Sequence, residues 1–141
     1  MNINMREKPM SRVQLALNVS DLDAAVDFYT RLFGEKPAKL KPDYANFAIA
    51  EPPLKLVLIA GEGAGGTLNH LGVEVGSSDE VAEANARLEA ENLETALEED
   101  IACCYARQDK VWVHDPDKAP WEIYTVLEDV EHLEKAATAC C

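Results

Sequence analysis

The chain contains no apolar run of about 18 residues, the length that a membrane-spanning helix needs. Its first ten residues, MNINMREKPM, also lack the apolar segment of a secretory signal. The first absence excludes a membrane-spanning helix from the sequence shown. With the second, it leads us to expect a cytoplasmic protein.

Basic side chains are scarce. The sequence holds 13 Lys and Arg against 26 Asp and Glu, which gives a formal net charge of −13. Nucleic-acid binding depends on Lys and Arg that displace counterions from phosphates, and anionic membrane surfaces attract basic segments. The charge balance therefore argues against nucleic acid and membrane partners, and the acidic excess is interpreted as a source of solubility.

The four cysteines are not dispersed along the chain. They form two adjacent pairs, Cys103-Cys104 and Cys140-Cys141. A small secreted scaffold spreads its cysteines so that disulfides connect distant loops, whereas neighbouring cysteines cross-link nothing remote. Without a secretory signal, we expect a reducing compartment and free thiols.

The 141 residues, 48% of them hydrophobic, suffice for one domain with a sizeable core. We expect residues 1–9 to be a disordered lead-in, residues 10–130 to form a single domain, and residues 131–141 to form a C-terminal tail.

The first half of this domain shows one strand, one helix and two further strands. The helix is expected to begin at Ser20, with Asp23 completing a capping box, and to end at Gly34. A glycine-rich loop from Gly61 to Gly66 closes the half. Alternation and turn signals predict strands over 13–19, 44–50 and 55–60.

The second half repeats this order. A shift of 56 positions (70 − 14) pairs Gln14 with His70, and a shift of 66 (122 − 56) pairs Leu56 with Glu122. Its predicted elements are a strand over 70–75, a helix over 79–92, and strands over 103–106, 110–114 and 121–126.

Neither half can bury its sheet face alone, so the repeat predicts two packed modules, 10–63 and 67–130. The expected fold class is α+β, with paired βαβββ modules forming a curved, barrel-like mixed sheet and helices outside.

The chain resembles the vicinal-oxygen-chelate superfamily, which includes glyoxalases and extradiol dioxygenases. The resemblance covers about residues 11 to 128. It rests on motif order and spacing: Asn18-Val19, Ser20-Asp21-Leu22-Asp23, Phe28-Tyr29, and Asp115-Pro116-Asp117 followed by Glu122.

The resemblance implies a metal held between the modules, at positions that correspond here to Gln14, Leu56, His70 and Glu122. Three of these can donate, and an amide, an imidazole and a carboxylate come close to the two-His, one-carboxylate set of non-haem Fe(II) enzymes. Fe(II) is the implied ion, with Ni, Co, Mn or Zn as other occupants, and dioxygen is the implied co-substrate. Glyoxalase I-type isomerases carry a carboxylate at the Leu56 position, so this chain departs from them.

The adjacent thiols of Cys103 and Cys104 are soft donors that suit thiophilic ions such as trivalent arsenic, cadmium or zinc. Because a strand sends adjacent side chains to opposite faces, chelation by both thiols requires a loop or a distorted backbone. We therefore expect a mobile segment at about 93–105.

Within the superfamily, the chain resembles the arsenic- and cadmium-inducible branch that includes organoarsenical carbon–arsenic lyases. The resemblance implies that an Fe(II)-dependent dioxygenase splits the C–As bond of trivalent methyl or aromatic arsenicals and releases arsenite. It rests on the segments Asn69-His70-Leu71-Gly72, Cys103-Cys104-Tyr105-Ala106, Lys110-Val111-Trp112-Val113 and Pro120-Trp121-Glu122-Ile123-Tyr124.

In that interpretation Cys103 and Cys104 hold the arsenic, and Cys140 and Cys141 are accessory thiols. No catalytic residue is expected beyond the metal ligands. The partner is a small organoarsenical, and the protein is a monomer or a homodimer.

The sequence is compatible with two alternatives. The chain could be a different extradiol dioxygenase or a glyoxalase of the same fold, which would leave the adjacent thiols without a role. It could also be a non-enzymatic resistance protein that binds arsenic or cadmium.

Overall fold

A computed structural model describes residues 11–103 and 105–130 of the chain. The expected lead-in, the expected C-terminal tail with Cys140 and Cys141, and Cys104 lie outside the described residues. The described residues form two compact units. The N-terminal unit is Val13–Gly72, and the C-terminal unit comprises Ser11, Arg12 and the described residues from Val73 onward. These units divide at Gly72, whereas the modules expected from the sequence divide between 63 and 67.

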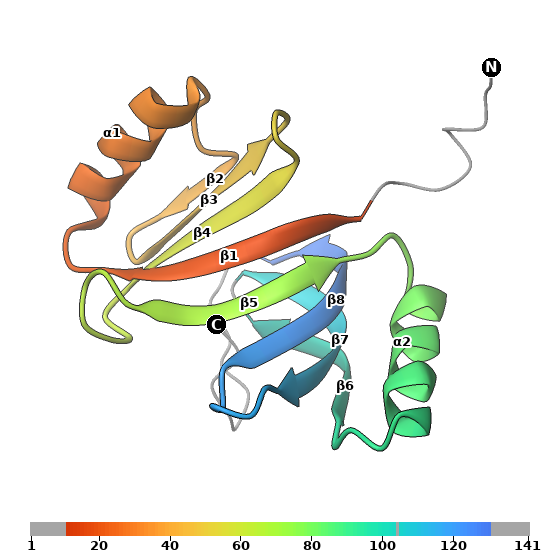
Figure 1. The fold of residues 1–141 in the computed structure, drawn as a ribbon. Coiled ribbons are helices and arrows are strands. Elements are labelled where there is room, and N and C mark those ends of the chain that lie inside the picture. Colours follow the sequence, from red (N-terminus) through yellow and green to blue (C-terminus); the bar gives the residue numbers. More distant parts are fainter. Residues whose placement is uncertain (1–10, 104, 131–141) are drawn as a thin grey trace. The chain divides into compact units, whose positions relative to one another are not determined.

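The N-terminal unit is a helix on a mixed sheet (Figure 1). Its strands lie in the order β2-β3-β4-β1-β5, with β1 parallel to β4 and the β2-β3 and β3-β4 pairs antiparallel. The short strand β2 was not predicted from the sequence. The elements are β1 (Arg12–Val19), α1 (Leu22–Phe33), β2 (Lys39–Lys41), β3 (Tyr44–Ile49), β4 (Leu54–Ala60) and β5 (Leu68–Glu74).

Helix α1 begins one residue later than the capping box predicted. Its N-cap is Asp21, whose carboxylate accepts a hydrogen bond of 3.0 Å from the Ala24 amide, so Ser20 is not the cap. The carboxylate is also better placed than a hydroxyl to stabilise the positive end of the helix. The other end is as predicted, because Gly34 is left-handed with φ of 73°.

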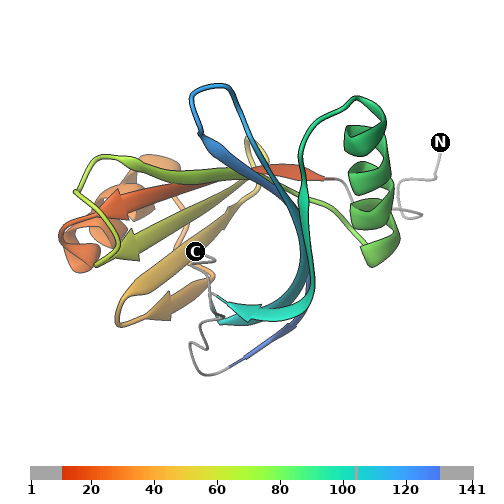
Figure 2. The same cartoon turned by 90° about the horizontal axis from the view of Figure 1, so that it is seen from below.

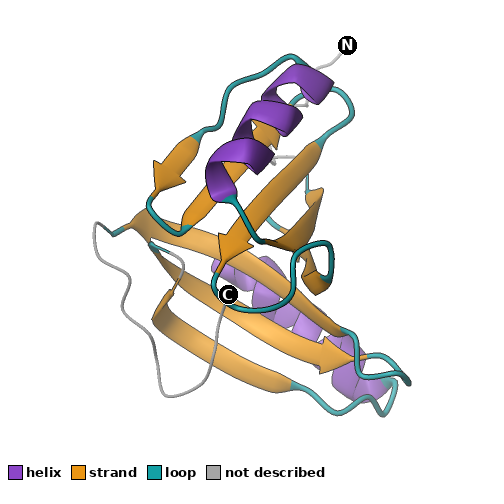
Figure 3. Ribbon diagram, turned by 90° about the vertical axis from the view of Figure 1, so that its left-hand side faces the viewer, coloured by secondary structure: helices purple, strands orange, loops and turns teal. Residues whose placement is uncertain are grey.

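The core of this unit lies between α1 and one face of its sheet, and Figure 3 shows the helix along that face. Leu56 and Leu58 of β4 pack there with Phe47 and Leu22. Leu56 pairs with Leu15 and Lys55 pairs with Gln14 across the β1-β4 ladder. Because paired residues share a face and neighbours alternate, Leu56 points to the helix side and Gln14 to the opposite side. The placement of Leu56 among the metal positions is therefore wrong.

The C-terminal unit packs a helix on an antiparallel ladder. Its strands lie in the order β8-β7-β6 and run side by side in Figure 2, with α2 packed against β7 and β8. Ser77 caps α2 by accepting a hydrogen bond from the Glu80 amide. The elements are α2 (Ser78–Ala90), β6 (Ala96–Cys103), β7 (Ala106–His114) and β8 (Pro120–Asp129).

Most of the segment expected to be mobile is strand β6. The β6-β7 register shifts between Glu98 and Ile101, and Asp100 has a positive φ of 54°. This distortion lies before the cysteines, so it is not the irregular backbone that chelation by both thiols would require. Cys103 is the last residue of β6 and pairs with Ala106, the first residue of β7, so the predicted single strand over 103–106 is wrong.

Neither helix among the described residues has the length and apolar character needed to cross a membrane.

Candidate functional site

Gln14 and His70 come together within the N-terminal unit. Gln14 lies on β1 and His70 on β5, with 4% and 3% of their surfaces exposed. The Gln14 Nε2 and His70 Nε2 atoms are 3.2 Å apart. The 56-residue shift seen in the sequence therefore corresponds to a direct contact between two buried polar side chains.

The other ring nitrogen of His70 has a defined partner. His70 Nδ1 lies 2.7 Å from Asn69 Oδ1, which as a carbonyl oxygen can only accept. Metal-binding histidines commonly donate one ring N–H to a carbonyl or carboxylate and ligate through the other nitrogen. The side chains of Gln14 and His70 thus fit a divalent ion in their chemistry and in their burial.

Glu122 belongs to the C-terminal unit, on β8, and is buried. Its Oε1 lies 2.8 Å from the Nζ atom of Lys110 on β7, which is itself only 1% exposed. Buried charges are rare unless paired, because removing an ion from water is costly. Glu122 is therefore not an ordinary exposed strand residue.

Lys110 also contacts the cysteine segment. Its Nζ atom lies 3.5 Å from Cys103 Sγ and 5.3 Å from the centre of the Trp112 ring. Lys110, Trp112, Glu122 and Cys103 thus share one face of the β6-β7-β8 ladder. Lys110 is the residue that sequence reasoning missed. Its signal was a lysine immediately before the apolar run Val111-Trp112-Val113.

Cys103 is fully buried, with its sulfur beside the Lys110 ammonium. Its carbonyl oxygen accepts a hydrogen bond of 3.0 Å from Gln108 Nε2, which fixes the backbone at the end of β6. The adjacent Tyr105 has a positive φ of 64°. The partner thiol Cys104 lies outside the described residues, so the pairing of the two thiols remains a prediction.

Replacing Lys110 by methionine is expected to lower the free energy of unfolding by about 3–5 kcal/mol in metal-free protein, because a buried carboxylate loses its cation. Urea denaturation measures the change. The double variant K110M/E122Q should recover part of the loss. The exposed pair Arg31–Asp27 provides the control, since R31M should change stability by less than about 1 kcal/mol. Equal effects of K110M and R31M would contradict this account.

No group of three or more His, Cys, Asp or Glu side chains gathers around a common point in the described part of the chain. The predicted triad has two side chains of these types, His70 and Glu122. Its third ligand would be the amide of Gln14.

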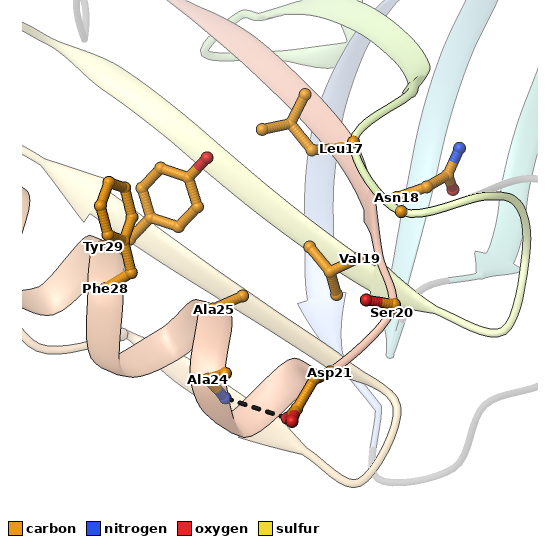
Figure 4. Close-up of a pocket in the computed structure, with 11 residues that line it drawn as sticks. Leu17, Asn18, Val19, Ser20, Asp21, Ala24, Ala25, Phe28 and Tyr29 are labelled. Atoms are coloured by element: carbon orange, nitrogen blue, oxygen red, sulfur yellow. Dashed lines mark hydrogen bonds between the residues drawn. The ribbon is translucent and has the colours of Figure 1, made fainter.

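The N-terminal unit also has a surface pocket of about 570 Å³ between the end of β1, α1 and the loop after β4 (Figure 4). Leu17, Val19, Phe28 and Tyr29 are among its lining residues, and Gln14 and His70 are not. In Figure 4, Asn18 and Val19 leave β1 on opposite sides. This pocket is therefore distinct from the pair of candidate ligands.

Comparisons with known proteins show the family and the fold. The family model described as "Glyoxalase/Bleomycin resistance protein/Dioxygenase superfamily" matches residues 11–123. A solved Mn(II)-bound glyoxalase from Novosphingobium aromaticivorans superposes with a TM-score of 0.61 at 19% identity, covering 91% of this chain and 44% of that one. At that identity the likeness shows the fold alone, and it confirms the fold class expected from the repeat.

Two curated relatives are much more similar in sequence. The "Cadmium-induced protein CadI" of Mycobacterium tuberculosis is 64% identical over 86% of this chain and 80% of its own length. The "Trivalent organoarsenical cleaving enzyme" of Thermomonospora curvata is 60% identical over 94% of this chain and 89% of its own. The chain belongs to the glyoxalase, bleomycin resistance protein and dioxygenase superfamily, in the branch of these arsenic- and cadmium-related proteins.

Proposed function

We propose that this protein is an Fe(II)-dependent dioxygenase that cleaves the carbon–arsenic bond of trivalent methyl or aromatic arsenicals and releases arsenite. The observation that carries the proposal is Lys110, whose ammonium contacts both Glu122 at 2.8 Å and Cys103 at 3.5 Å. A candidate metal ligand and a candidate arsenic ligand thus share one buried cation. The similarity to trivalent organoarsenical cleaving enzymes supplies the substrate class.

Gln14, His70 and Glu122 are the residues that would hold the metal. An amide oxygen, an imidazole nitrogen and a carboxylate suit a divalent ion and leave positions open for other ligands. The ion would supply the activation of dioxygen that the side chains by themselves lack. Lys110 balances the charge of Glu122 in surroundings that exclude water.

The thiols would capture the substrate. Each cysteine forms one As–S bond as one As–OH bond breaks, and the thiol proton leaves with the hydroxyl group as water. Two such exchanges leave the organic substituent as the remaining group on arsenic. Cys103 is suited to this task because its backbone is held by Gln108 and its sulfur lies beside the Lys110 ammonium, which favours the thiolate. Holding the arsenic in one orientation is the main contribution to rate that these residues make.

The decisive assay follows inorganic arsenite released from methylarsenite or phenylarsenite by the Fe(II)-reconstituted protein. We expect multiple turnovers in air and none when dioxygen is removed. Equal release under both conditions, or no release under either, would contradict the proposal. Catechol and a glutathione hemithioacetal serve as parallel substrates, and turnover of either one instead of the arsenicals would favour another member of the superfamily.

A second candidate is a protein that sequesters cadmium or arsenite without catalysis. The similarity to the cadmium-induced relatives favours it. Its signature is tight stoichiometric binding of Cd(II) or arsenite, measured by calorimetry, together with the absence of any product from the organoarsenicals.

A further inference from the structure

His70 is the inner end of a chain of hydrogen bonds that runs out to the surface of the N-terminal unit. His70 Nδ1 lies 2.7 Å from Asn69 Oδ1, and Asn69 Nδ2 donates to Asn18 Oδ1 at 3.0 Å. Asn18 Nδ2 then donates to Thr67 Oγ1 at 2.9 Å, and the Thr67 hydroxyl donates to the carbonyl oxygen of Ala64 at 2.6 Å. All of these residues belong to one unit, and the chain links β5, β1 and the loop before β5.

The outermost hydrogen bond fixes which group donates and which accepts at every step of this series. A backbone carbonyl oxygen can only accept, so the Thr67 hydroxyl must donate to Ala64 and present a lone pair to Asn18. The Asn18 amide therefore places its NH₂ group toward Thr67 and its oxygen toward Asn69. By the same reasoning Asn69 turns its oxygen toward His70, and the neutral His70 ring carries its proton on Nδ1.

The inner contact of His70 fits the same direction. With the proton on Nδ1, His70 Nε2 is an acceptor, and the Gln14 amide nitrogen 3.2 Å away is a matching donor. A ring with its proton on Nε2 would set two N–H groups against each other there and two acceptors against each other at Asn69. One proton arrangement thus satisfies every link from Gln14 to Ala64.

The glycine-rich loop, Gly61–Gly66, packs against Asn18, the middle residue of this series of hydrogen bonds. The Asn18 amide N–H donates to the Thr67 carbonyl at 2.9 Å, and the Gly66 amide donates to the Asn18 carbonyl at 2.9 Å. A Cβ atom at Gly63 would lie 2.8 Å from Asn18 Nδ2, closer than real Cβ atoms come, and 3.1 Å from its Cγ, which is also a tight contact. A glycine at position 63 is therefore what lets the loop approach the Asn18 amide.

We propose that Asn69 and Asn18 are positioning residues that hold His70 in the tautomer whose Nε2 lone pair binds the metal. This rests on the proposed metal role of His70. It assigns a purpose to the Asn69-His70 sequence and to the Gly61–Gly66 loop, neither of which the ligand set explains. Outer partners of this kind typically change metal affinity by about 10- to 100-fold.

The first test reads the tautomer directly in metal-free full-length protein. Long-range ¹H–¹⁵N NMR spectra, recorded where the ring is neutral, should show the His70 proton on Nδ1. Asn69→Leu removes the acceptor, and the proton should move largely to Nε2. Asn69→Asp keeps an acceptor beside Nδ1 and should keep the wild-type tautomer. Asn46→Leu is the matched control, since Asn46 is a buried asparagine of the same unit that donates to Tyr44 instead.

The second test measures Co(II) affinity by calorimetry in the same variants. N69L should weaken binding by about 10- to 100-fold, N18L by less, and N46L by less than about threefold. N69D should also weaken binding by less than N69L, because its carboxylate keeps the acceptor at Nδ1 but cannot donate to Asn18. Gly63→Ala should resemble N18L, because its methyl group displaces the Asn18 amide.

A His70 proton found on Nε2 in the wild type, or an N69L variant with unchanged tautomer and Co(II) affinity, would overturn the inference. The wild-type spectrum decides this even if N69L fails to fold. Neither readout uses an arsenical. A protein with the expected tautomer and affinities but no arsenite release would refute the proposed function and leave this inference standing.

Discussion

Replacing His70 by alanine is expected to weaken Fe(II) or Co(II) binding by more than about 100-fold and to abolish arsenite release. Loss of an outer partner alone typically costs about 10- to 100-fold in affinity, and loss of a ligand should cost more. Glu122→Ala should have a comparable effect on the metal. Metal content after dialysis and calorimetric titration measure both losses.

The matched control is His114→Ala. His114 ends β7, is exposed, and is not among the proposed ligands. Its replacement should leave metal content and turnover at the wild-type level. If H114A loses the metal as H70A does, or if H70A retains the metal in full, the proposed ligand set is wrong. Circular dichroism of each variant separates loss of a ligand from loss of the fold.

Replacing Cys103 by serine is expected to reduce arsenite release at least about 100-fold while the metal content stays unchanged. A hydroxyl group does not replace a soft thiolate toward arsenic. With one As–S bond missing, the substituent is no longer held in one orientation, and a misplacement of about 1 Å can cost about 100-fold in rate. Cys104→Ser should behave in the same way.

Because Cys103 is buried, its replacement also tests packing, so Cys103→Ala should be measured alongside it. Both variants should keep wild-type metal content and a cooperative unfolding transition. The double variant C140S/C141S is the comparison, since those thiols are expected to be accessory at most. Loss of turnover in C140S/C141S with full activity in C103S would move the arsenic site to the C-terminal pair.

The ion pair of Lys110 and Glu122 affects how variants of Glu122 are interpreted. Both side chains are buried, and Lys110 also contacts the Cys103 sulfur. Variants of Glu122 therefore change the charge beside Cys103 as well as the metal ligands. His70 variants leave both members of the Lys110–Glu122 pair in place. This is the reason for choosing His70 as the primary ligand test.

The sequence by itself determined the order of the elements apart from β2 and β6, the internal repeat and the pairing of Gln14 with His70. Periodicity of apolar residues depends only on local geometry, so strands such as β1 and β4 and the helices could be recognised without tertiary information. The shift of 56 positions worked because equivalent points of two similar modules carry the polar residues. The end of α1 at Gly34 could be predicted in the same way, because a glycine after a helix depends only on the local backbone conformation.

The tertiary structure decided which face each side chain takes and which partner it meets. Leu56 faces α1 because of its register with Leu15, and register is set by strand pairing between distant segments. The contacts of Lys110 with Glu122 and Cys103, and the chain from His70 through Asn69 to Asn18, likewise join residues through the sheet. Such contacts leave no periodic signal in the sequence, because they depend on how strands align in space and not on the spacing of residues along one strand.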